Sequence, residues 1–381
     1  MLKDATAIVG IGQTAFARRL EPSELELACM AVKAALDDAG IGPAEVDALG
    51  SYTMEGTPEF ELARNLGLGD LTFFSKVDYG GGAGCGAVGQ VATAVASGIA
   101  NVGVVWRSRK RGDPKKRVWA HVTERIDDHW KWSRPAGLVR PVDEVAMLMR
   151  RYMHEYGATR EHLANVALAC RRHANRNPGA FMYERQLSRG QYMQARWVSE
   201  PLCLFDNCLE SDGAVAVVIT RSNRARDCPH PPAYLHAWSQ GLSRQHQSMT
   251  DYHSANPLQG TSWAAAKNLW RQADFGPKDV KVAQFYDAFS PLILFSLEAY
   301  GFCRPGEGAA FTNSGAIELG GRLPINTSGG SLSEAYIHGM NLVVEGVRQI
   351  RGTSTAQVPS ADVCLVTSAA LVPTGAILLR R

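Results

Sequence analysis

The sequence predicts an α/β protein made of two similar halves, the first of which carries an insertion. Two patterns each occur twice in the chain of 381 residues. A helical segment is followed by the same Gly-Pro-x-x-Val motif at residues 42–46 and again at residues 276–280. A glycine-rich turn also leads twice into a helix and a further strand. A strand that feeds a helix through such a turn is the α/β pattern, which places ligands at the carboxyl ends of the strands.

The first helical segment spans residues 23–39. Ser23 is suited to the N-cap position and Gly40 to the C-terminal stop. The corresponding segment of the second half spans residues 261–273. Apolar side chains in the first segment are spaced three and four residues apart, on one face of a helix: Leu25, Cys29, Val32 and Leu36.

The glycine-rich turns give the closer correspondence between the halves. Each turn is followed by a helix, a stop at glycine and an apolar strand. In the first half these elements are residues 77–82, 88–96, 97–98 and 102–105. In the second half they are residues 325–330, 340–350, 352 and 363–366. Four elements repeated in the same order predict a duplicated unit.

Residues from about 107 to 200 differ from the repeats and predict an inserted loop domain. This segment begins with basic residues, continues with tryptophan and histidine, and then shows helical patterns at 143–156 and 159–175. We therefore expect an N-terminal half at residues 1–228, which carries the insertion, and a C-terminal half at residues 229–381.

The composition is that of a soluble globular enzyme. Hydrophobic residues make up 45% and charged residues 20%, and the net charge of +3 gives no reason to expect nucleic-acid binding. No apolar stretch approaches the ~18 residues of a membrane span. The eight cysteines are scattered without the spacing of a disulfide framework or a metal site, so we predict no metal and no cofactor. Asp4 stands where a signal peptide needs apolar residues, which favours a cytoplasmic location.

Four motifs together resemble the thiolase superfamily, in particular its sterol-carrier-protein-type branch. They stand in order along nearly the whole chain, at Ala7–Thr14, Ser211–Ala214, Tyr286–Ser290 and Asn326–Gly330. The resemblance implies a thiolase fold, in which two duplicated α/β halves form a layered αβαβα core. It also implies a homodimer formed through the core sheet.

The chain departs from the thiolase pattern at four reactive positions. Gly81 stands at the position of the nucleophilic cysteine, and Tyr286 at that of an asparagine or histidine. Tyr336 stands at the position of the catalytic histidine, and Ser368 at that of the C-terminal cysteine. An acyl-cysteine intermediate requires a thiolate at the helix tip, which Gly81 cannot supply. A shift of the alignment by two residues would instead bring His338 to the histidine position.

These changes are similar to those of the bacterial steroid side-chain aldolases, and the resemblance implies a retro-aldol cleavage without an acyl-enzyme. A steroid β-hydroxyacyl-CoA would be split into a 17-ketosteroid and propionyl-CoA. The reaction needs a base, an acid and donors for the thioester enolate. We assign Tyr336 as the base and Tyr286 as the acid, with the reverse assignment open, and the backbone of residues 80–82 as the oxyanion site. A tyrosine base requires nearby positive charge or a helix N-terminus.

Several further residues have both a structural and a functional interpretation. His338 and Asp287 either orient the tyrosines or satisfy turns and the core. Arg107 and Arg109 begin a basic run that is either a solvated loop or a site for the phosphates of CoA. The turn at Gly329–Gly330 is expected to contact the substrate.

Two other functions stay open. A non-catalytic member of the superfamily would bind acyl-CoA or lipid at a decayed site. An acetyl-CoA acetyltransferase-type thiolase would need Cys85 as its nucleophile, although a small buried core thiol is the simpler interpretation of that residue. The resemblance to the steroid aldolases also implies a steroid acyl-CoA substrate and a small OB-fold partner of the acyl-CoA-associated type.

Overall fold

The computed structural model describes residues 2–112, 130–247 and 249–381. Its main sheet has nine strands in the order β3-β2-β4-β7-β1-β8-β11-β10-β9, and β5 and β6 form a separate small sheet. The strands are β1 (Thr6–Gln13), β2 (Ala48–Tyr52), β3 (Phe73–Val77), β4 (Val102–Arg109), β5 (Trp197–Ser199), β6 (Leu202–Cys203), β7 (Gly213–Arg221), β8 (Ala233–Gly241), β9 (Val282–Gln284), β10 (Val363–Thr367) and β11 (Thr374–Arg380).

The strands fall into two groups with the same order and directions, which confirms the predicted duplication. In the first half, β2 is parallel to β4, and β7 pairs antiparallel with both β4 and β1. In the second half, β9 is parallel to β10, and β11 pairs antiparallel with both β10 and β8. The equivalent of β3 is reduced to a parallel bridge between Ala283 and Ile325. The halves join where β1 pairs with β8.

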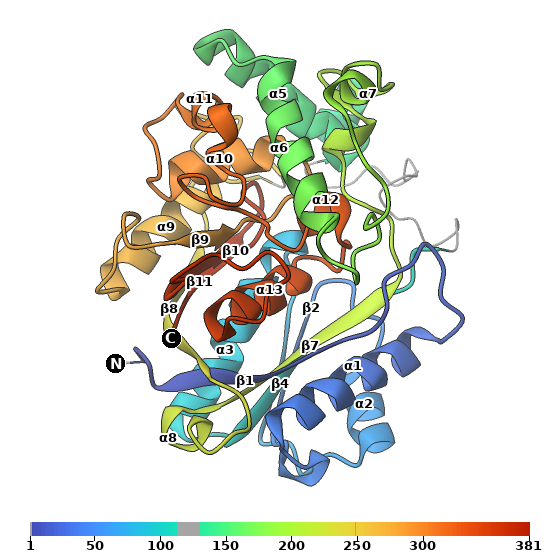
Figure 1. Ribbon diagram of the computed structural model, residues 1–381, viewed down its shortest axis with the longest axis vertical. Coiled ribbons are helices and arrows are strands. Elements are labelled where there is room, and N and C mark those ends of the chain that lie inside the picture. Colours follow the sequence, from blue (N-terminus) through green and yellow to red (C-terminus); the bar gives the residue numbers. More distant parts are fainter. Residues whose placement is uncertain (1, 113–129, 248) are drawn as a thin grey trace.

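Two buried helices lie between the part of the sheet that the first half forms and the part that the second half forms. α3 (Gly84–Ser97) packs against β2 and β8, and α13 (Met340–Arg351) packs against β7 and β10. Figure 1 shows both helices at the centre of the molecule. α1 (Glu24–Ala39) covers the outer face of the first half and α9 (Thr261–Gln272) that of the second. This arrangement is the αβαβα layering that the thiolase resemblance implies.

Local sequence signals fix the ends of α1. The Ser23 hydroxyl accepts a hydrogen bond from the backbone N–H of Glu26, and Gly40 ends the helix with a φ of +65°, as predicted. The buried face differs in part from the prediction, because Leu25 lies only at its edge. Small residues such as Ala35 complete this face and let β1 approach the helix closely.

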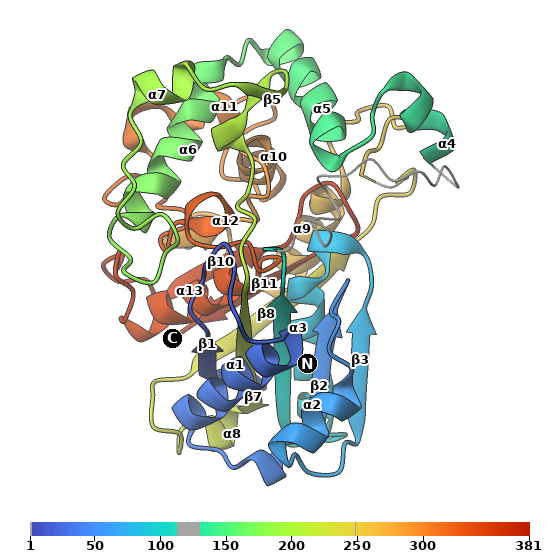
Figure 2. The same cartoon turned by 90° about the vertical axis from the view of Figure 1, so that its right-hand side faces the viewer.

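The insertion lies beyond the C-terminal ends of β2 and β3, in the upper part of Figure 2. Both predicted helical patterns are confirmed, as α5 (Pro141–Tyr156) and α6 (Arg160–Ala174). Residues 113–129, which hold the later part of the basic run and the first part of the segment with tryptophan and histidine, lie outside the described residues. The described helices of the insertion are α4 (Trp130–Ser133), α5 (Pro141–Tyr156), α6 (Arg160–Ala174) and α7 (Arg189–Met193).

The remaining helices are short or lie at the periphery. They are α2 (Glu59–Leu66), α8 (Ser222–Ala225), α10 (Pro291–Ala299), α11 (Gly308–Phe311) and α12 (Gly330–Ser333). The proposed boundary at residues 228 and 229 falls between α8 and β8. Within the described ranges, no helix combines the length and apolar character needed to cross a membrane.

Candidate active site

A cavity of about 1050 Å³ lies where the two halves and the insertion meet. Most of its lining side chains are apolar. The first half outside the insertion contributes Thr53, Met54, Tyr79, Gly80, Gly81 and Phe205; the insertion contributes Arg111, Trp130, Val142, Val145, Phe181 and Met182; the second half contributes Tyr286, Leu292, Leu332, Tyr336, His338 and Leu371. Apolar walls with a few polar groups are typical of a small-molecule site.

The structure brings the two tyrosines singled out from the sequence into direct contact. Tyr286 follows the short strand β9, and Tyr336 lies between α12 and α13. Their hydroxyl oxygens are 2.7 Å apart, within hydrogen-bond distance. Both residues line the cavity, although their exposed fractions are only 2% and 5%. The two side chains therefore present a coupled pair of phenols to the cavity.

Gly81 leaves room for this pair. A Cβ atom built at Gly81 would lie 2.0 Å from the hydroxyl oxygen of Tyr286 and 2.4 Å from its Cζ. The space that a side chain would take at this position is therefore occupied by the phenol of Tyr286. A nucleophile at position 81 and the observed Tyr286 rotamer exclude each other.

The motif at residues 211–214 holds Tyr336 and a nearby arginine. The backbone N–H of Tyr336 donates to the Ser211 hydroxyl over 2.9 Å. The Asp212 carboxylate accepts from the backbone N–H groups of Arg111 and Gly112. Arg111 is buried, and its guanidinium lies 4.8 Å from the centroid of the Tyr336 ring. This arginine places a positive charge beside Tyr336, the kind of neighbour that we expect for a tyrosine base.

The surroundings of the two phenols differ. Burial raises the pKa of Tyr336 to about 12, while the charge of Arg111 and the hydrogen bond from Tyr286 act in the opposite direction. Burial also raises the pKa of Tyr286 well above its usual value, and the contact with Tyr336 raises it further. The hydrogen bond between the phenols stabilises either one when it is deprotonated, and the charge of Arg111 beside Tyr336 favours Tyr336 as the phenol that carries the negative charge.

Asp287 connects the segments that carry the two tyrosines. Its fully buried carboxylate accepts from the backbone N–H of Ser331 over 2.7 Å and of Leu332 over 3.2 Å. The close approach requires glycine at position 330, where a Cβ would stand 2.2 Å from the carboxylate. Gly329 and Gly330 do not line the cavity, so their contribution is to this packing rather than to substrate contact.

Comparisons with known proteins identify the family. The model of the thiolase N-terminal domain matches residues 6–188, and that of the thiolase C-terminal domain-like region matches residues 241–378. The chain belongs to the thiolase superfamily. A human mitochondrial 3-ketoacyl-CoA thiolase superposes with a TM-score of 0.71 over 100% of this chain and 99% of its own, at 12% identity, a likeness that shows the thiolase fold alone.

Full-length relatives place the chain among thiolase-superfamily lyases. A steroid side-chain-cleaving aldolase of Thermomonospora curvata is 44% identical, over 100% of this chain and 98% of the relative. A 17-hydroxy-3-oxo-4-pregnene-20-carboxyl-CoA lyase of Mycobacterium tuberculosis is 45% identical over the whole of both chains. The solved structure of an Ltp2-ChsH2(DUF35) aldolase has a TM-score of 0.95 and 44% identity, over 100% of this chain and 98% of its own. The chain is thus a homologue of steroid-CoA aldolases.

The cysteine that a thiolase reaction would need is not at the cavity. Cys85 has an exposed fraction of 2%, and burial raises its pKa to about 12. Its backbone N–H donates to the Ser368 hydroxyl over 3.0 Å. Neither residue lines the cavity. Cys85 is the buried core thiol that the sequence favours, and Ser368 anchors the first turn of α3.

Arg107 and Arg109 correct the interpretation of the basic run. The strand β4 continues through both residues, which are buried rather than part of a solvated loop. Arg107 is 0% exposed and lies 3.3 Å from the carboxylate of Glu55, while Arg109 donates to the carbonyl oxygen of Met54. Neither lines the cavity, so burial contradicts their expected contact with CoA phosphates.

The regular spacing of the arginines in this run is the sequence signal that they form a buried face rather than a solvated loop. Residues two apart on a strand point to the same side of a sheet, and Arg107, Arg109 and Arg111 are spaced in this way. The spacing indicates one buried face of arginines that begins on β4. Sequence reasoning treated these residues as a charge run and therefore missed Arg111.

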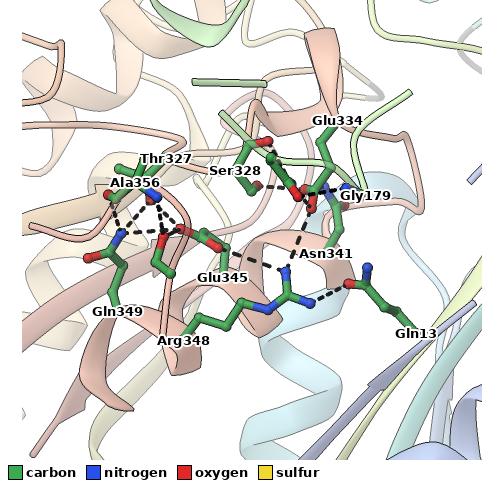
Figure 3. A network of polar contacts seen from close by, with 12 residues as sticks. Gln13, Gly179, Thr327, Ser328, Glu334, Asn341, Glu345, Arg348, Gln349 and Ala356 are labelled. Carbon is green, nitrogen blue, oxygen red and sulfur yellow. Dashed lines mark hydrogen bonds and ion pairs between the residues drawn. The ribbon is translucent and has the colours of Figure 1, made fainter. Parts of the chain in front are cut away.

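A buried polar network contains Glu334, which stands two residues before Tyr336 in the chain (Figure 3). The carboxylate of Glu334 accepts from the Ser328 hydroxyl over 2.6 Å and lies 3.9 Å from a guanidinium nitrogen of Arg348. The same nitrogen lies 3.9 Å from Glu345, a second buried carboxylate. One guanidinium thus serves two buried carboxylates, and burial raises the pKa of Glu334 to about 7. The network ties the segment that carries Tyr336 to α13.

The raised pKa of Glu334 predicts a pH dependence of stability. Between its ordinary value of 4.5 and about 7, the folded protein holds a proton that the unfolded chain has released. Folding therefore becomes less favourable as pH rises through this window. From about pH 5 to about pH 8, we expect the free energy of unfolding of the wild type to fall relative to that of the Glu334→Gln variant.

Urea denaturation at several pH values measures this difference. Glu161→Gln, which changes an exposed carboxylate on α6, is the matched control and should keep the pH profile of the wild type. Parallel profiles for wild type and Glu334→Gln would contradict the prediction.

Proposed function

We propose that this chain cleaves the side chain of a steroid acyl-CoA by a retro-aldol reaction without an acyl-enzyme. The substrate is a 17-hydroxysteroid that carries a short β-hydroxyacyl-CoA side chain, and the products are a 17-ketosteroid and propionyl-CoA. The observation that carries the proposal is the pair of tyrosine hydroxyls, 2.7 Å apart, in the space beside Gly81. Homology to two lyases named for this kind of substrate supports the choice.

The first step is proton removal from the β-hydroxyl group. Tyr336 acts as the base, and the guanidinium of Arg111 beside its ring stabilises the phenolate. The electron pair of the O–H bond forms the ketone. The bond between the hydroxyl-bearing carbon and the α-carbon of the thioester breaks, and its electrons form the thioester enolate. No bond to the protein is made or broken.

The second step is protonation of the enolate carbon. Tyr286 donates its proton to the α-carbon and so releases propionyl-CoA. The proton that Tyr336 took from the substrate then passes to Tyr286 through the hydrogen bond between the two hydroxyls. This transfer restores both phenols to their starting states, with no net uptake or release of a proton.

Donors for the enolate oxygen lie at the glycine turn. Residues 80–82 form a single 3-10 turn before α3, and Gly80 and Gly81 line the cavity. We assign their backbone N–H groups to the developing oxyanion, because such groups can approach a ligand closely where there is no side chain. Glycine at position 81 therefore serves both the turn and the phenol of Tyr286.

The rim of the cavity supplies candidates for the phosphates of CoA in place of Arg107 and Arg109. Arg18, Arg185 and Arg196 are exposed and line the cavity. No described residue forms an ion pair with any of them. Guanidinium groups bind phosphate through paired hydrogen bonds, so three of them around one opening favour a polyphosphate.

We also propose two protein partners. A homodimer through the edge of the core sheet is supported by β3, which stands at the sheet edge in this chain and exposes 66% of Phe74. A small OB-fold, acyl-CoA-associated partner is supported by the two-component name of the Ltp2-ChsH2(DUF35) aldolase. A chain that is fully active alone as a homodimer would contradict the second partner. The cytoplasmic location stays a prediction.

A binding-only protein is the main rival function, since the apolar cavity would hold a lipid without catalysis. The contact between Tyr286 and Tyr336 favours catalysis, because a decayed site has no need to keep two phenols in hydrogen-bond contact beside a buried arginine. An acetyltransferase reaction through Cys85 is disfavoured by the burial of that thiol.

The proposal is tested by product analysis. The purified chain, alone and with a co-expressed OB-fold partner, is given a 17-hydroxysteroid acyl-CoA, and the products are followed by mass spectrometry. We expect the 17-ketosteroid and propionyl-CoA in equal amounts. Tight binding of the substrate without cleavage under both conditions would overturn the proposal in favour of the binding-only protein.

A further inference from the structure

His338 lies beside the tyrosine pair, and its neighbours determine where its ring carries a proton. The Nδ1 atom lies 3.0 Å from a guanidinium nitrogen of Arg107. A guanidinium has only donors, so Nδ1 must accept this hydrogen bond. A neutral imidazole that accepts at Nδ1 carries its proton at Nε2. The buried Arg107 therefore selects the Nε2–H tautomer of His338.

Arg107 is itself held in place. Its guanidinium lies 3.3 Å from the Glu55 carboxylate and 5.3 Å from the centroid of the Tyr52 ring. Glu55 is fixed in turn by the backbone N–H of Ser108. The Tyr52 hydroxyl donates to the carbonyl oxygen of His338 over 2.9 Å. Both the backbone and the ring of His338 are thus anchored by the first half of the chain.

The ring stays neutral in this setting. Burial lowers the pKa of His338 well below its usual value, and the charges of Arg107, Arg111 and Arg109 lower it further. His338 lines the cavity, and its ring centroid is 5.2 Å from that of Tyr336. Among the described residues, Nε2 has no hydrogen-bond partner, although the residue is only 1% exposed. An N–H group at the wall of a cavity that has no protein partner is placed to donate its hydrogen bond to a ligand bound there.

We propose that His338 is a catalytic residue whose Nε2–H donates a hydrogen bond to the thioester oxygen of the substrate as that oxygen becomes the enolate oxyanion. The inference rests on the proposed aldol cleavage, for which it supplies a side-chain donor in addition to the glycine turn. The proton stays on Nε2 throughout, so the bond changes of the reaction are unaltered. Because Nε2 is already protonated, His338 does not serve as the general base, and that role remains with Tyr336.

A spectrum of the wild-type protein tests the tautomer without any assay of activity. Long-range nitrogen–proton correlation spectra of protein labelled in its histidines distinguish the two neutral tautomers and the charged ring. The signal of His338 is assigned as the one that disappears in His338→Gln. We expect the Nε2–H tautomer from about pH 6 to about pH 8. An Nδ1–H tautomer or a protonated ring in this range would overturn the inference, whatever the fate of the aldolase proposal.

Kinetics test the donor role. We expect His338→Ala to lower kcat by about 10²-fold or more, as for the loss of one oxyanion donor, with little change in KM. His338→Gln, which keeps an N–H donor, should recover part of the loss. His154→Gln, at an exposed histidine on α5, should match the wild type. Unchanged kcat in His338→Ala would overturn the donor role. A wild type that shows the expected tautomer but no cleavage would overturn the proposed function and, with it, the donor role.

Discussion

Tyr336→Phe is expected to lower kcat by about 10³-fold, because it removes the base without changing the shape of the cavity. Binding of the acyl-CoA should remain within about 2-fold of wild type, since the lost hydroxyl is not an anchor for the substrate. Steady-state turnover of the steroid acyl-CoA and calorimetric titration with a non-cleavable analogue that lacks the β-hydroxyl separate these two effects. The matched substitution Tyr286→Phe should also lower kcat, because it removes the acid and breaks the hydrogen bond that returns the proton.

Tyr300→Phe provides the control for these substitutions. Tyr300 is buried, does not line the cavity, and its hydroxyl has no hydrogen-bond partner among the described residues. Its loss should leave both kcat and binding near wild type. Full turnover in Tyr336→Phe or Tyr286→Phe would show that the phenols do not perform the chemistry.

Gly81→Ala is expected to lower kcat by about 10²-fold or more through displacement of Tyr286. The added Cβ would stand 2.0 Å from the Tyr286 hydroxyl, so this side chain would have to leave the position in which it contacts Tyr336. Gly81→Cys restores the residue type of the thiolases at this position but should be equally inactive as an aldolase. Turnover and thermal denaturation, measured together, distinguish a displaced phenol from a general loss of folding.

Gly190→Ala on α7 is the control for the glycine substitution. A Cβ there would meet its nearest neighbour at 3.9 Å, an ordinary van der Waals distance. This variant should keep wild-type turnover. An active Gly81→Ala enzyme would contradict the packing of Tyr286 against residue 81 and, with it, the arrangement of the catalytic pair.

Local signals in the sequence were sufficient for much of the fold. The cap at Ser23, the stop at Gly40 and the repeated glycine turns depend on neighbouring residues, so they can be read without the tertiary structure. The duplication followed from the order of these signals. In the second half, the strand equivalent to β3 is reduced to a bridge at Ile325. This reduction could not be predicted, because it depends on pairing with a distant strand.

Family motifs made it possible to predict which residues belong to the candidate site. The contacts among these residues could not be predicted, because they depend on packing between distant parts of the chain. The motifs brought Tyr286 and Tyr336 to attention, but nothing in the sequence gives the contact between their hydroxyls across 50 residues. The spacing of Arg107, Arg109 and Arg111 indicates that they share one face, but their roles depend on which distant side chains pack against that face, and the sequence does not give those contacts. The tautomer of His338 depends on Arg107, which is 231 residues away along the chain.

The measurement that tests the central claim most directly is the intact mass of the protein during turnover. The enzyme is mixed with steroid acyl-CoA, quenched with acid while products are still forming, and examined by mass spectrometry. Cleavage without an acyl-enzyme predicts an unmodified protein mass at every time point while the 17-ketosteroid accumulates. A transient increase by the mass of an acyl group, lost again as substrate runs out, would show a covalent intermediate and contradict the account.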